Sequence, residues 1–377
     1  MNPTVERLAV AAYTVPTAGG PESDGTLEWE STTMVVVEAA AGGAQGIGYS
    51  YAHAAAGALI EDALAPAVVG GDALSPAAAS ARMRQRTRNL GQPGLASCAV
   101  SAVDVALWDL KAKLLGLPLV DLLGAVRESV PVYGSGGFTS ESAGELEAQL
   151  GGWAAEGIRR VKMKVGRRPE EDPERVAAAR RAVGPEVELM VDANGAFSPA
   201  QALALAERFA EHGVTWFEEP VSSDDAAGLA WLCRRAPPGM EIAAGEYAWR
   251  LDDFRQLLAA DAVDVLQADA TRCGGVTGFL AAAALGEAHH RPLSAHCAPA
   301  LHVALGCACA PLRHLEWFAD HVRIERAFFD GAPEPIAGEV RPDRSRPGLG
   351  LELRREEVER YRAGRRSSRR AGARPEE

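Results

Sequence analysis

The sequence lacks the features that would assign the protein to a membrane or nucleic-acid class. No apolar run approaches the ~20 residues that cross a bilayer, and residues 1–10 lack the apolar region of a signal peptide. The formal net charge of −12 argues against a nucleic-acid partner, because phosphate binding needs a positive face. We therefore expect a cytoplasmic protein that binds neither membranes nor nucleic acids.

The sequence also lacks paired cysteines. No cysteine belongs to a C-x-x-C pair or has a histidine partner at zinc-finger spacing, so neither a disulfide framework nor a zinc site is indicated. We expect buried free thiols at Cys98, Cys233, Cys273, Cys297, Cys307 and Cys309.

Residues 1–125 have a mixed pattern that predicts an α+β domain. The segment 32–39 is β-branched and strand-like, and Gly42, Gly43, Gly46 and Gly48 mark a turn into a second extended segment. Residues 97–115 carry apolar side chains at helical spacing. A hairpin followed by helices is the simplest interpretation.

From residue 130 onward, eight short strand-like segments alternate with Ala-rich helical segments. This rhythm closes into a barrel more readily than it forms an open sheet. The predicted fold class is α/β, a modified (β/α)8 TIM barrel with an N-terminal α+β capping domain. Because about 190 residues is short for such a barrel, we expect its last helical layer or its lid to come from elsewhere in the chain.

The expected domain division follows from these patterns. Residues 1–125 form the cap and 126–323 the barrel, while the Pro- and Gly-rich stretch 324–353 returns to the cap. Residues 354–377 are rich in arginine and almost without apolar side chains, which predicts a disordered tail. Binding to an anionic surface or to RNA is an alternative role for that tail.

Seven apolar runs in the second half of the chain each end in an ionisable residue. Active sites of barrels lie at the carboxyl ends of the strands, so these residues would share one rim. In chain order they are Lys164, Asp192, Glu218, Glu246, Asp269, His296 and Glu316.

Lys162 and Lys164 lie on the same side of their strand, because side chains alternate with a period of two. Two close cations disfavour protonation, so one lysine would have a lowered pKa and serve as a base. The alternative is a pair of exposed lysines on an edge strand.

Asp192, Glu218 and Glu246 end three consecutive strands, so their carboxylates would converge. Such a cluster repels itself without a cation, and hard oxygen ligands favour Mg²⁺. Each acid could instead cap the following helix. Asn194 and Glu219 are candidates for supporting roles around the metal.

The Asp269–His296 pair has a different character. An aspartate beside a histidine fixes the tautomer of the ring and supports its protonated form, which makes the histidine a general acid or base. Glu316 would donate a hydrogen bond to substrate or pair with Arg313 or Arg323. A base, a metal and an Asp–His pair together suit abstraction of a proton α to a carboxylate.

With these residues in this order, the sequence resembles the enolase superfamily, and within it the mandelate racemase subgroup. The resemblance covers nearly the whole chain. Its motifs are WDLKAKLLGLPL from Trp108, KMK from Lys162, DAN from Asp192, EEP from Glu218, GE at Gly245, QADATRCGG from Gln267, His296 and Glu316.

The resemblance implies particular roles for these residues. It implies Mg²⁺, or Mn²⁺ as a substitute, on Asp192, Glu218 and Glu246, with Lys164 and the His296–Asp269 pair as acid/base groups. Lys162 would contact the substrate carboxylate, Glu316 the enediolate, and Tyr133, Ser135 and Asn194 the substrate. A homo-oligomer is implied by the same analogy.

The residues after the sixth strand narrow the branch of the family. Muconate-lactonising and dipeptide-epimerase branches carry a lysine there, whereas this chain has Asp269 followed by ATR. The resemblance therefore implies a lyase that dehydrates an aldonate- or aldarate-type acid sugar to a 2-keto-3-deoxy product. A racemase or epimerase is the first alternative, and a non-catalytic barrel that binds a small-molecule carboxylate is the second.

The specificity loop of the family corresponds to residues 16–29. Glu22, Asp24 and Trp29 would face the substrate there, and acidic groups suit the hydroxyls of a polyol or a cationic group. The alternative is that these acidic groups are solvated charges of a surface loop.

Overall fold

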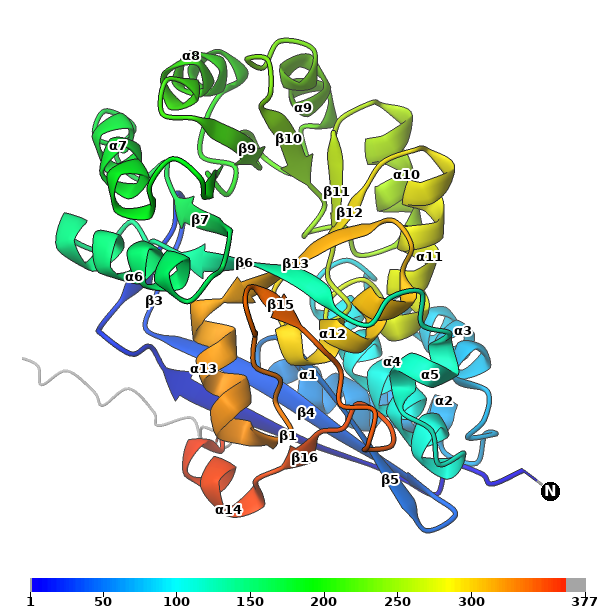
Figure 1. The fold of residues 1–377 in the computed structure, drawn as a ribbon. Helices are drawn as coiled ribbons and strands as arrows, with labels where there is room; N and C mark the ends of the chain where they lie inside the picture. Colours follow the sequence, from blue (N-terminus) through cyan, green and yellow to red (C-terminus); the bar gives the residue numbers. More distant parts are fainter. Residues whose placement is uncertain (1, 364–377) are drawn as a thin grey trace, which may run out of the picture.

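Eight parallel strands form a closed barrel in the computed structural model, which describes residues 2–363 (Figure 1). Each strand pairs with the next along the chain, and β13 pairs with β6 to close the ring. The predicted fold class is therefore confirmed. The strands are β6 (Val130–Gly136), β7 (Arg160–Lys164), β8 (Glu188–Asp192), β9 (Val214–Glu218), β10 (Glu241–Ala244), β11 (Val265–Ala268), β12 (Leu293–Ala295) and β13 (Leu312–Phe318).

A helix follows every barrel strand. The last helical layer does not come from elsewhere in the chain, because α13 follows β13 directly and extends past residue 323, so only the alternative of a lid from elsewhere remains. The helices are α6 (Ala143–Ala155), α7 (Asp172–Val183), α8 (Pro199–Ala210), α9 (Ala226–Cys233), α10 (Leu251–Ala259), α11 (Gly275–Ala288), α12 (Pro299–Ala308) and α13 (Ala319–Phe328).

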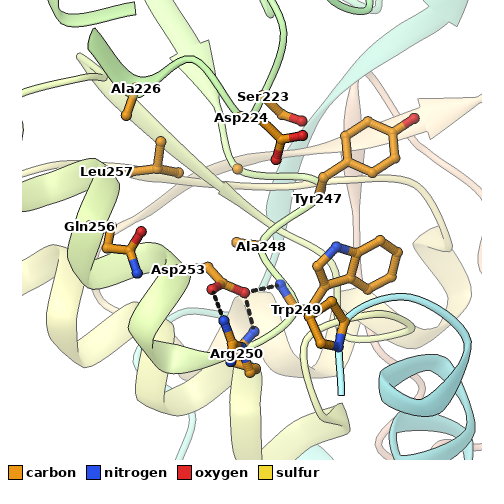
Figure 2. A pocket seen from close by; sticks show the side chains of 12 residues that line it. Ser223, Asp224, Ala226, Tyr247, Ala248, Trp249, Arg250, Asp253, Gln256 and Leu257 are labelled. Atoms are coloured by element: carbon orange, nitrogen blue, oxygen red, sulfur yellow. Dashed lines mark hydrogen bonds and ion pairs between the residues drawn. The ribbon is translucent and has the colours of Figure 1, made fainter. Parts of the chain in front are cut away.

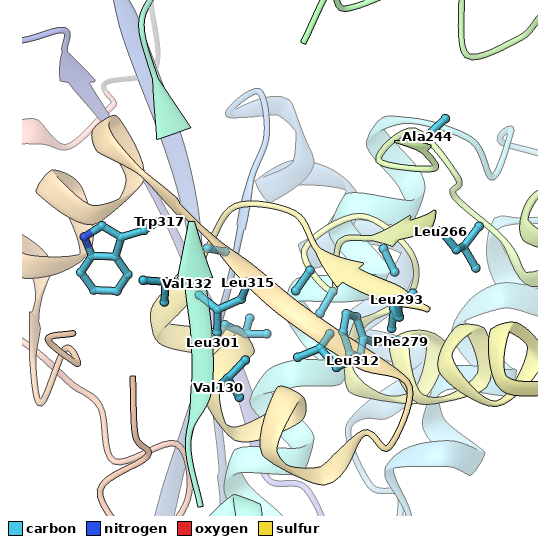
Figure 3. Packing of buried hydrophobic residues seen from close by; sticks show 14 of the residues in the cluster. Val130, Val132, Ala244, Leu266, Phe279, Leu293, Leu301, Leu312, Leu315 and Trp317 are labelled. Carbon is cyan, nitrogen blue, oxygen red and sulfur yellow. The ribbon is translucent and has the colours of Figure 1, made fainter. Parts of the chain in front are cut away.

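Local sequence explains where several of these helices begin. Ser142 and Glu145 form a capping box at the start of α6, and Ser198 and Gln201 form another at α8. The inner faces of the helices then pack on the strands. Figure 3 shows this between β6 and β13, where Leu301 of α12 lies among buried side chains that include Val132, Leu312 and Leu315. Burial of each such side chain contributes about 1.5–3 kcal/mol.

An antiparallel sheet and a layer of helices form the cap (Figure 1). The sheet has the order β1–β4–β5, and the predicted hairpin is its β4–β5 pair. The first strand, β1, was not predicted. The cap elements are β1 (Arg7–Pro16), β2 (Glu22–Ser23), β3 (Glu28–Trp29), β4 (Ser31–Ala41), β5 (Ala44–Tyr51), α1 (Ala55–Leu59), the π-helix η1 (Ile60–Leu64), α2 (Ala65–Val68), α3 (Pro76–Thr87), α4 (Leu95–Leu114) and α5 (Leu119–Leu123).

The four glycines of the hairpin have two different roles. Gly42 and Gly43 form the turn with positive φ, as expected. Gly46 and Gly48 lie within β5 instead, and a Cβ on either would meet a carbonyl oxygen of α4 at 2.3 Å. These two glycines therefore allow the longest cap helix to lie directly on the sheet.

The segment after α13 contacts both cap and barrel. β14 (Phe329–Asp330) pairs with β16 (Glu352–Leu353), and β15 (Glu339–Val340) adds to β6. The amide of Leu119 in the cap donates to the carbonyl of Gly348. We propose that residues 1–125 form the cap, that residues 126–323 form the barrel, and that 324–353 is a segment that joins them.

The predicted start of the disordered tail at residue 354 needs correction. Residues 355–358 form α14 (Arg355–Val358), and residues 359–361 form the 3-10 turn η2 (Glu359–Tyr361). Val358 is buried, and the Ala363 amide donates to the carbonyl of Ala12 in β1. The few apolar side chains of this stretch therefore find a partner in the cap sheet. The rest of the predicted tail, 364–377, lies outside the described residues. Within residues 2–363, no helix is both long and apolar enough to cross a membrane.

Two buried aspartates on α4 hold the cap against the remainder of the chain. Asp109 accepts backbone hydrogen bonds from Ile47 (2.7 Å) and Leu349 (2.6 Å). Asp104 accepts from the amide (3.0 Å) and the hydroxyl (2.7 Å) of Thr277 on barrel helix α11. Burial raises the pKa of Asp104 to about 7, although the Thr277 hydrogen bonds act in the opposite direction.

Replacing Asp104 by Asn should change how stability depends on pH. Between about pH 4 and pH 7 the unfolded chain ionises Asp104 while the folded chain keeps it protonated, so this residue makes the wild type less stable as pH rises. Asp104→Asn removes that contribution. Urea unfolding at pH 4 to 8 should therefore show the variant gaining on the wild type by at least about 1 kcal/mol across this window.

The exposed Asp62→Asn is the control, and it should follow the wild type within about 0.5 kcal/mol at every pH. Parallel curves for Asp104→Asn and the wild type would contradict the assignment.

Candidate active site

A cavity of about 480 Å³ lies between the barrel rim and the cap. We call it the barrel-mouth cavity. Residues from the carboxyl ends of the strands form its floor, and residues of the cap loop and of β4 and β5 form its wall. Its lining includes Lys164, Glu246, Asp269, His296 and Glu316 from the barrel, and Asp24, Leu27, Trp29, Thr32 and Tyr51 from the cap.

Three buried carboxylates meet beneath this cavity, and of the three only Glu246 lines it. One ligand oxygen from each of Asp192, Glu218 and Glu246 lies within 4.8 Å of the others. Their strands, β8, β9 and β10, are neighbours in the barrel, so the convergence follows from the sheet order. None of the three acids accepts from the first turn of a helix in the described contacts, which disfavours the alternative of helix caps.

The cluster has the properties of a site for a hard divalent cation. Burial and the neighbouring Asp192 raise the pKa of Glu218, because two negative charges share a space that water does not reach. One oxygen of Glu246 is buried without a hydrogen-bond partner. A cation of the Mg²⁺ type, which prefers carboxylate oxygens, would relieve both conditions.

The two lysines do not behave as the like-charge argument predicts. Lys162 Nζ lies 2.5 Å from Glu218 Oε1 and 2.9 Å from Glu316 Oε1, and Lys164 Nζ lies 2.5 Å from Asp192 Oδ2. Burial disfavours both ammonium groups, yet these carboxylates outweigh it and raise the pKa of each lysine. In the described structure the pKa shift of both lysines is therefore opposite in direction to the expected one, because carboxylates outnumber cations here.

The two lysines also differ in position. Lys164 lines the barrel-mouth cavity, whereas Lys162 is fully buried beneath the carboxylates and does not line it. The contact between Lys162 and a substrate carboxylate stays a prediction. In the described structure Lys162 ties Glu218 to Glu316.

His296 is oriented by Asp269, as predicted. His296 Nδ1 lies 2.8 Å from Asp269 Oδ2, and the Thr271 amide donates to the other oxygen of Asp269 at 2.6 Å. Although burial opposes it, the hydrogen bond and charge of His296 lower the pKa of Asp269 to about 2. His296 Nε2 is thereby directed to the cavity, 3.0 Å from Glu246 Oε2. That contact is an ion-pair distance without hydrogen-bond alignment.

Sequence reasoning missed Arg272 as a member of the site. Its guanidinium contacts Glu246 Oε1 at 3.3 Å and Asp269 Oδ2 at 3.6 Å, and it lies over the ring of Tyr247. Arg272 therefore links the carboxylate cluster to the His–Asp pair. Its position three residues after a strand-ending acid was the available signal.

Two hydrogen bonds, one to each carboxylate oxygen, hold the side chain of Glu316 in place. Ser135 Oγ donates to Glu316 Oε1 at 2.6 Å, and the Cys297 amide donates to Oε2 at 2.8 Å. Neither Arg313 nor Arg323 contacts it, since these residues pair with Glu241 and Asp320. Glu316 lines the cavity, which is compatible with the expected contact to substrate.

Ser135 and Tyr133 do not line the cavity, contrary to expectation. Ser135 is fully buried and positions Glu316. The Tyr133 ring lies deeper in the barrel against Trp216 and His314, where it belongs to a small apolar cluster. Both side chains point inward from β6, but from levels below the rim.

Backbone strain is concentrated where the strands end. Four non-glycine residues have positive φ there, which costs roughly 1–3 kcal/mol each. Contacts with the surrounding structure hold this strained backbone in place. At Asn194, for example, the amide donates to Asp192 Oδ1 at 2.9 Å. Asn194 lines the cavity, while Glu219 is buried beside it. The four residues are Asn194 (46°), Glu219 (34°), Cys297 (52°) and Ala298 (43°).

The cap loop brings two of its three predicted residues to the cavity. Asp24 and Trp29 line it, whereas Glu22 lines a different cavity and accepts a hydrogen bond from Trp29 Nε1 at 3.1 Å. Asp24 Oδ1 accepts from the amides of Thr26 and Leu27, both at 2.7 Å. The carboxylate of Asp24 thus shapes the loop, and the expected role of Glu22 at the substrate is not supported.

A second cavity of about 370 Å³ opens beside the barrel mouth (Figure 2). Tyr247 lines both cavities, whereas Trp249, Asp224 and Gln256 line this one and not the barrel-mouth cavity. It contains neither lysine, nor His296, nor any acid of the carboxylate cluster. The reactive groups therefore belong to the barrel-mouth cavity alone.

A capped barrel with a metal-type carboxylate cluster between two proton-transferring groups defines a class of metal-dependent acid–base enzymes. Residues 14–124 match the model of the mandelate racemase / muconate lactonizing enzyme N-terminal domain, and residues 145–358 match the enolase C-terminal domain-like model. The chain belongs to this family of the enolase superfamily.

Individual relatives agree with this membership. A mandelate racemase/muconate lactonizing enzyme-like protein from Rubrobacter xylanophilus is 57% identical, with a TM-score of 0.94 over 96% of this chain and 100% of that chain. A 3,6-anhydro-alpha-L-galactonate cycloisomerase from Streptomyces coelicolor is 33% identical over 93% of this chain and 98% of the relative.

An L-talarate dehydratase from a Polaromonas species, solved with Mg and L-glucarate, is 31% identical over 96% of this chain and 98% of that chain. Its TM-score is 0.86. The bound magnesium in this relative agrees with the cofactor that the carboxylate cluster predicts.

Gly25 places the tip of the cap loop on the barrel, and its replacement should open the loop. A Cβ at Gly25 would meet the Ala193 carbonyl oxygen at 2.3 Å. Gly25→Ala should therefore destabilise the loop by about 1–3 kcal/mol. Hydrogen exchange of the amides in residues 22–30 should become about 10–100-fold faster, as measured by mass spectrometry.

Gly19→Ala is the matched control in the same loop, since a Cβ there meets nothing within 4 Å. Equal exchange rates in both variants would show that Gly25 is not the contact that seats the loop.

Proposed function

We propose that this protein is a Mg²⁺-dependent dehydratase of an acid sugar, of the aldonate or aldarate type. The observation that carries the proposal is the arrangement of proton-transferring groups around one carboxylate cluster. Lys164 lies on one side, the His296–Asp269 pair lies on the other, and both open into the same cavity. β6 and β13 separate their strands, β7 and β12, around the closed barrel.

The proton-transferring groups of the cavity match the steps of a dehydration. Either Lys164 or His296 removes the proton α to the substrate carboxylate, and the electron pair forms a C=C bond as the β-hydroxyl leaves. His296 would protonate that hydroxyl, which departs as water. The resulting enol takes up a proton at the β-carbon and becomes a 2-keto-3-deoxy acid.

Asp192, Glu218 and Glu246 would hold the metal, whose charge stabilises the negative charge that the substrate carboxylate gains when the α-proton leaves. Beneath them, Lys162 fixes the orientation of Glu218 and Glu316. Glu316 presents an oxygen to the cavity while Ser135 holds the other. These contacts keep the floor rigid, which is what stabilisation of a developing charge requires.

The cavity wall supports a hydroxylated substrate. Asp24, Thr32 and Asn194 offer polar groups there, and Trp29 and Tyr51 offer aromatic surface. The dehydratase among the relatives was solved with L-glucarate, an acid sugar. A volume of about 480 Å³ is in the range of small-molecule sites.

Two other reactions use the same proton abstraction. A racemase or epimerase would use Lys164 and His296 on opposite faces of one carbanion, and the two-sided arrangement favours this as the second candidate. A cycloisomerase, as named among the relatives, would instead expel an internal ring oxygen. All three reactions begin with the same proton abstraction. The dehydratase then expels the β-hydroxyl and the cycloisomerase a ring oxygen, whereas the racemase or epimerase returns a proton to the α-carbon and expels nothing.

Turnover of an acid-sugar library in D₂O with Mg²⁺ distinguishes these reactions. We expect a 2-keto-3-deoxy acid with deuterium at the β-carbon, detected by mass spectrometry. Lys164→Ala and His296→Asn should each lower turnover by about 10²–10⁴-fold, because each removes a group that transfers a proton. Deuterated epimers without keto acid would overturn the dehydratase in favour of an epimerase.

His212→Asn is the control for the histidine variant, since His212 lies at the carboxyl end of α8, on the opposite side of the barrel from the active-site rim. It should turn over substrate as the wild type does.

The metal assignment has its own test by calorimetry. Asp192→Ala removes one carboxylate of the cluster, so Mg²⁺ affinity should fall by at least about 10–100-fold, the loss that even an indirect partner of a metal ligand causes. Asp224→Ala changes an exposed acid of the second cavity and should bind Mg²⁺ as the wild type does. Equal affinities in both variants would refute the site.

The remaining expectations stay predictions. We propose a homo-oligomer, which light scattering of the purified protein would test, and a cytoplasmic location.

A further inference from the structure

A second group of potential metal ligands lies beside the carboxylate cluster. It consists of His296, Cys297 and Glu316, whose ligand atoms lie within 4.8 Å of one another. His296 Nε2 is 3.3 Å from Cys297 Sγ and 3.8 Å from Glu316 Oε2. All three side chains line the barrel-mouth cavity and are at most 6% exposed.

These separations match those between ligands of a small four-coordinate ion. Zinc–nitrogen and zinc–sulfur bonds of about 2.0–2.3 Å at tetrahedral angles place ligand atoms roughly 3.4–3.6 Å apart. The observed values of 3.3 and 3.8 Å lie on either side of this range. A fourth position would face the cavity.

The second ring nitrogen of the histidine is supported as in known zinc sites. His296 Nδ1 is engaged by Asp269 Oδ2 at 2.8 Å, which leaves Nε2 as the ligand atom. Glu316 is fixed by Ser135 through Oε1, which leaves Oε2 facing the group. Both ligands are therefore held in place by contacts of their own.

The loop that carries the cysteine is equally constrained. Cys297 has a φ of 52°, and its amide donates to Glu316 Oε2 at 2.8 Å. Its carbonyl lies 2.8 Å from Nδ1 of the buried His302, whose Nε2 accepts from the Ala270 amide. This left-handed backbone directs the thiol toward His296, and the contacts of His302 hold it there.

The chemistry of the group differs from that of the carboxylate cluster. Asp192, Glu218 and Glu246 offer only hard oxygens, which Mg²⁺ prefers. A sulfur, a nitrogen and an oxygen together favour a thiophilic ion such as Zn²⁺ or Cd²⁺. The two sites would therefore select different ions although they lie side by side.

We propose that His296, Cys297 and Glu316 form a second metal site that binds a thiophilic divalent ion such as Zn²⁺ or Cd²⁺. Binding releases two protons to solvent, one from the S–H bond of Cys297 and one from Nε2 of the His296 imidazolium, so that the thiolate and the neutral His296 Nε2 both coordinate. An ion on Nε2 prevents the ring from carrying a proton. Under the proposed function, the ion is thus an inhibitor.

Titration of the Mg²⁺-saturated enzyme with Cd²⁺ tests the site directly. Bonding between cadmium and a thiolate produces an ultraviolet charge-transfer absorption, which does not depend on activity. We expect this band in the wild type at one equivalent of Cd²⁺. It should be lost in Cys297→Ala and in Cys297→Ser, where the serine keeps a polar atom beside His296.

Two variants act as matched controls. Cys309→Ala removes another buried thiol, which lies outside the cavity, and should keep the band. Asp192→Asn alters the carboxylate cluster and should also keep it. Calorimetric Mg²⁺ binding by both Cys297 variants verifies that they are folded.

The outcomes separate this site from the proposed function. No band in the wild type, or a band that survives in the Cys297 variants, would overturn the site. A band lost in Asp192→Asn would place the ion at the carboxylate cluster and overturn it as well. If acid sugars are not substrates, the proposed function fails while the binding result stands.

Discussion

The burial of three carboxylates in one small space is the constraint on which the rest of the structure depends. Like charges in a medium that excludes water repel strongly, so Asp192, Glu218 and Glu246 need a fixed scaffold and counter-charges. Lys162 and Lys164 supply the counter-charges from the neighbouring strand. The closed ring of strands supplies the scaffold, since parallel strands bring their carboxyl ends to a single rim.

The cap and the barrel divide the work between chemistry and selection. The carboxylate cluster, Lys164 and the His296–Asp269 pair all lie on the barrel, whereas the wall that a substrate would meet comes largely from the cap. The separation lets the wall vary without disturbing the charge balance of the floor. Gly25 and the α4 aspartates show how closely the two parts are nevertheless joined.

The barrel rim also places hard and soft ligands side by side. Glu246 follows β10 and contacts His296, which follows β12 and adjoins Cys297. One side of the cavity floor thus consists of oxygens and the other includes nitrogen and sulfur. The same left-handed backbone at Cys297 that directs the thiol inward also lets its amide hold Glu316.

The sequence by itself determined the barrel and the residues of its rim. Strand and helix periodicities are local, and a residue that ends a parallel strand must lie at the rim whatever the details of packing, which is why Asp192 and His296 could be assigned. Tertiary structure alone decided the depth of each side chain, since Tyr133 and Ser135 lie on a barrel strand, β6, and yet do not line the cavity.

The tertiary structure also decided the protonation of buried side chains and the close packing of distant segments. The pKa of a lysine depends on which carboxylates face it, and these come from other strands. The packing of Gly46 on α4, and of residues 355–363 on the cap sheet, likewise depends on elements distant in the chain. Pattern in a sequence reports what a residue's neighbours along the chain require, and only the fold reveals its neighbours in space.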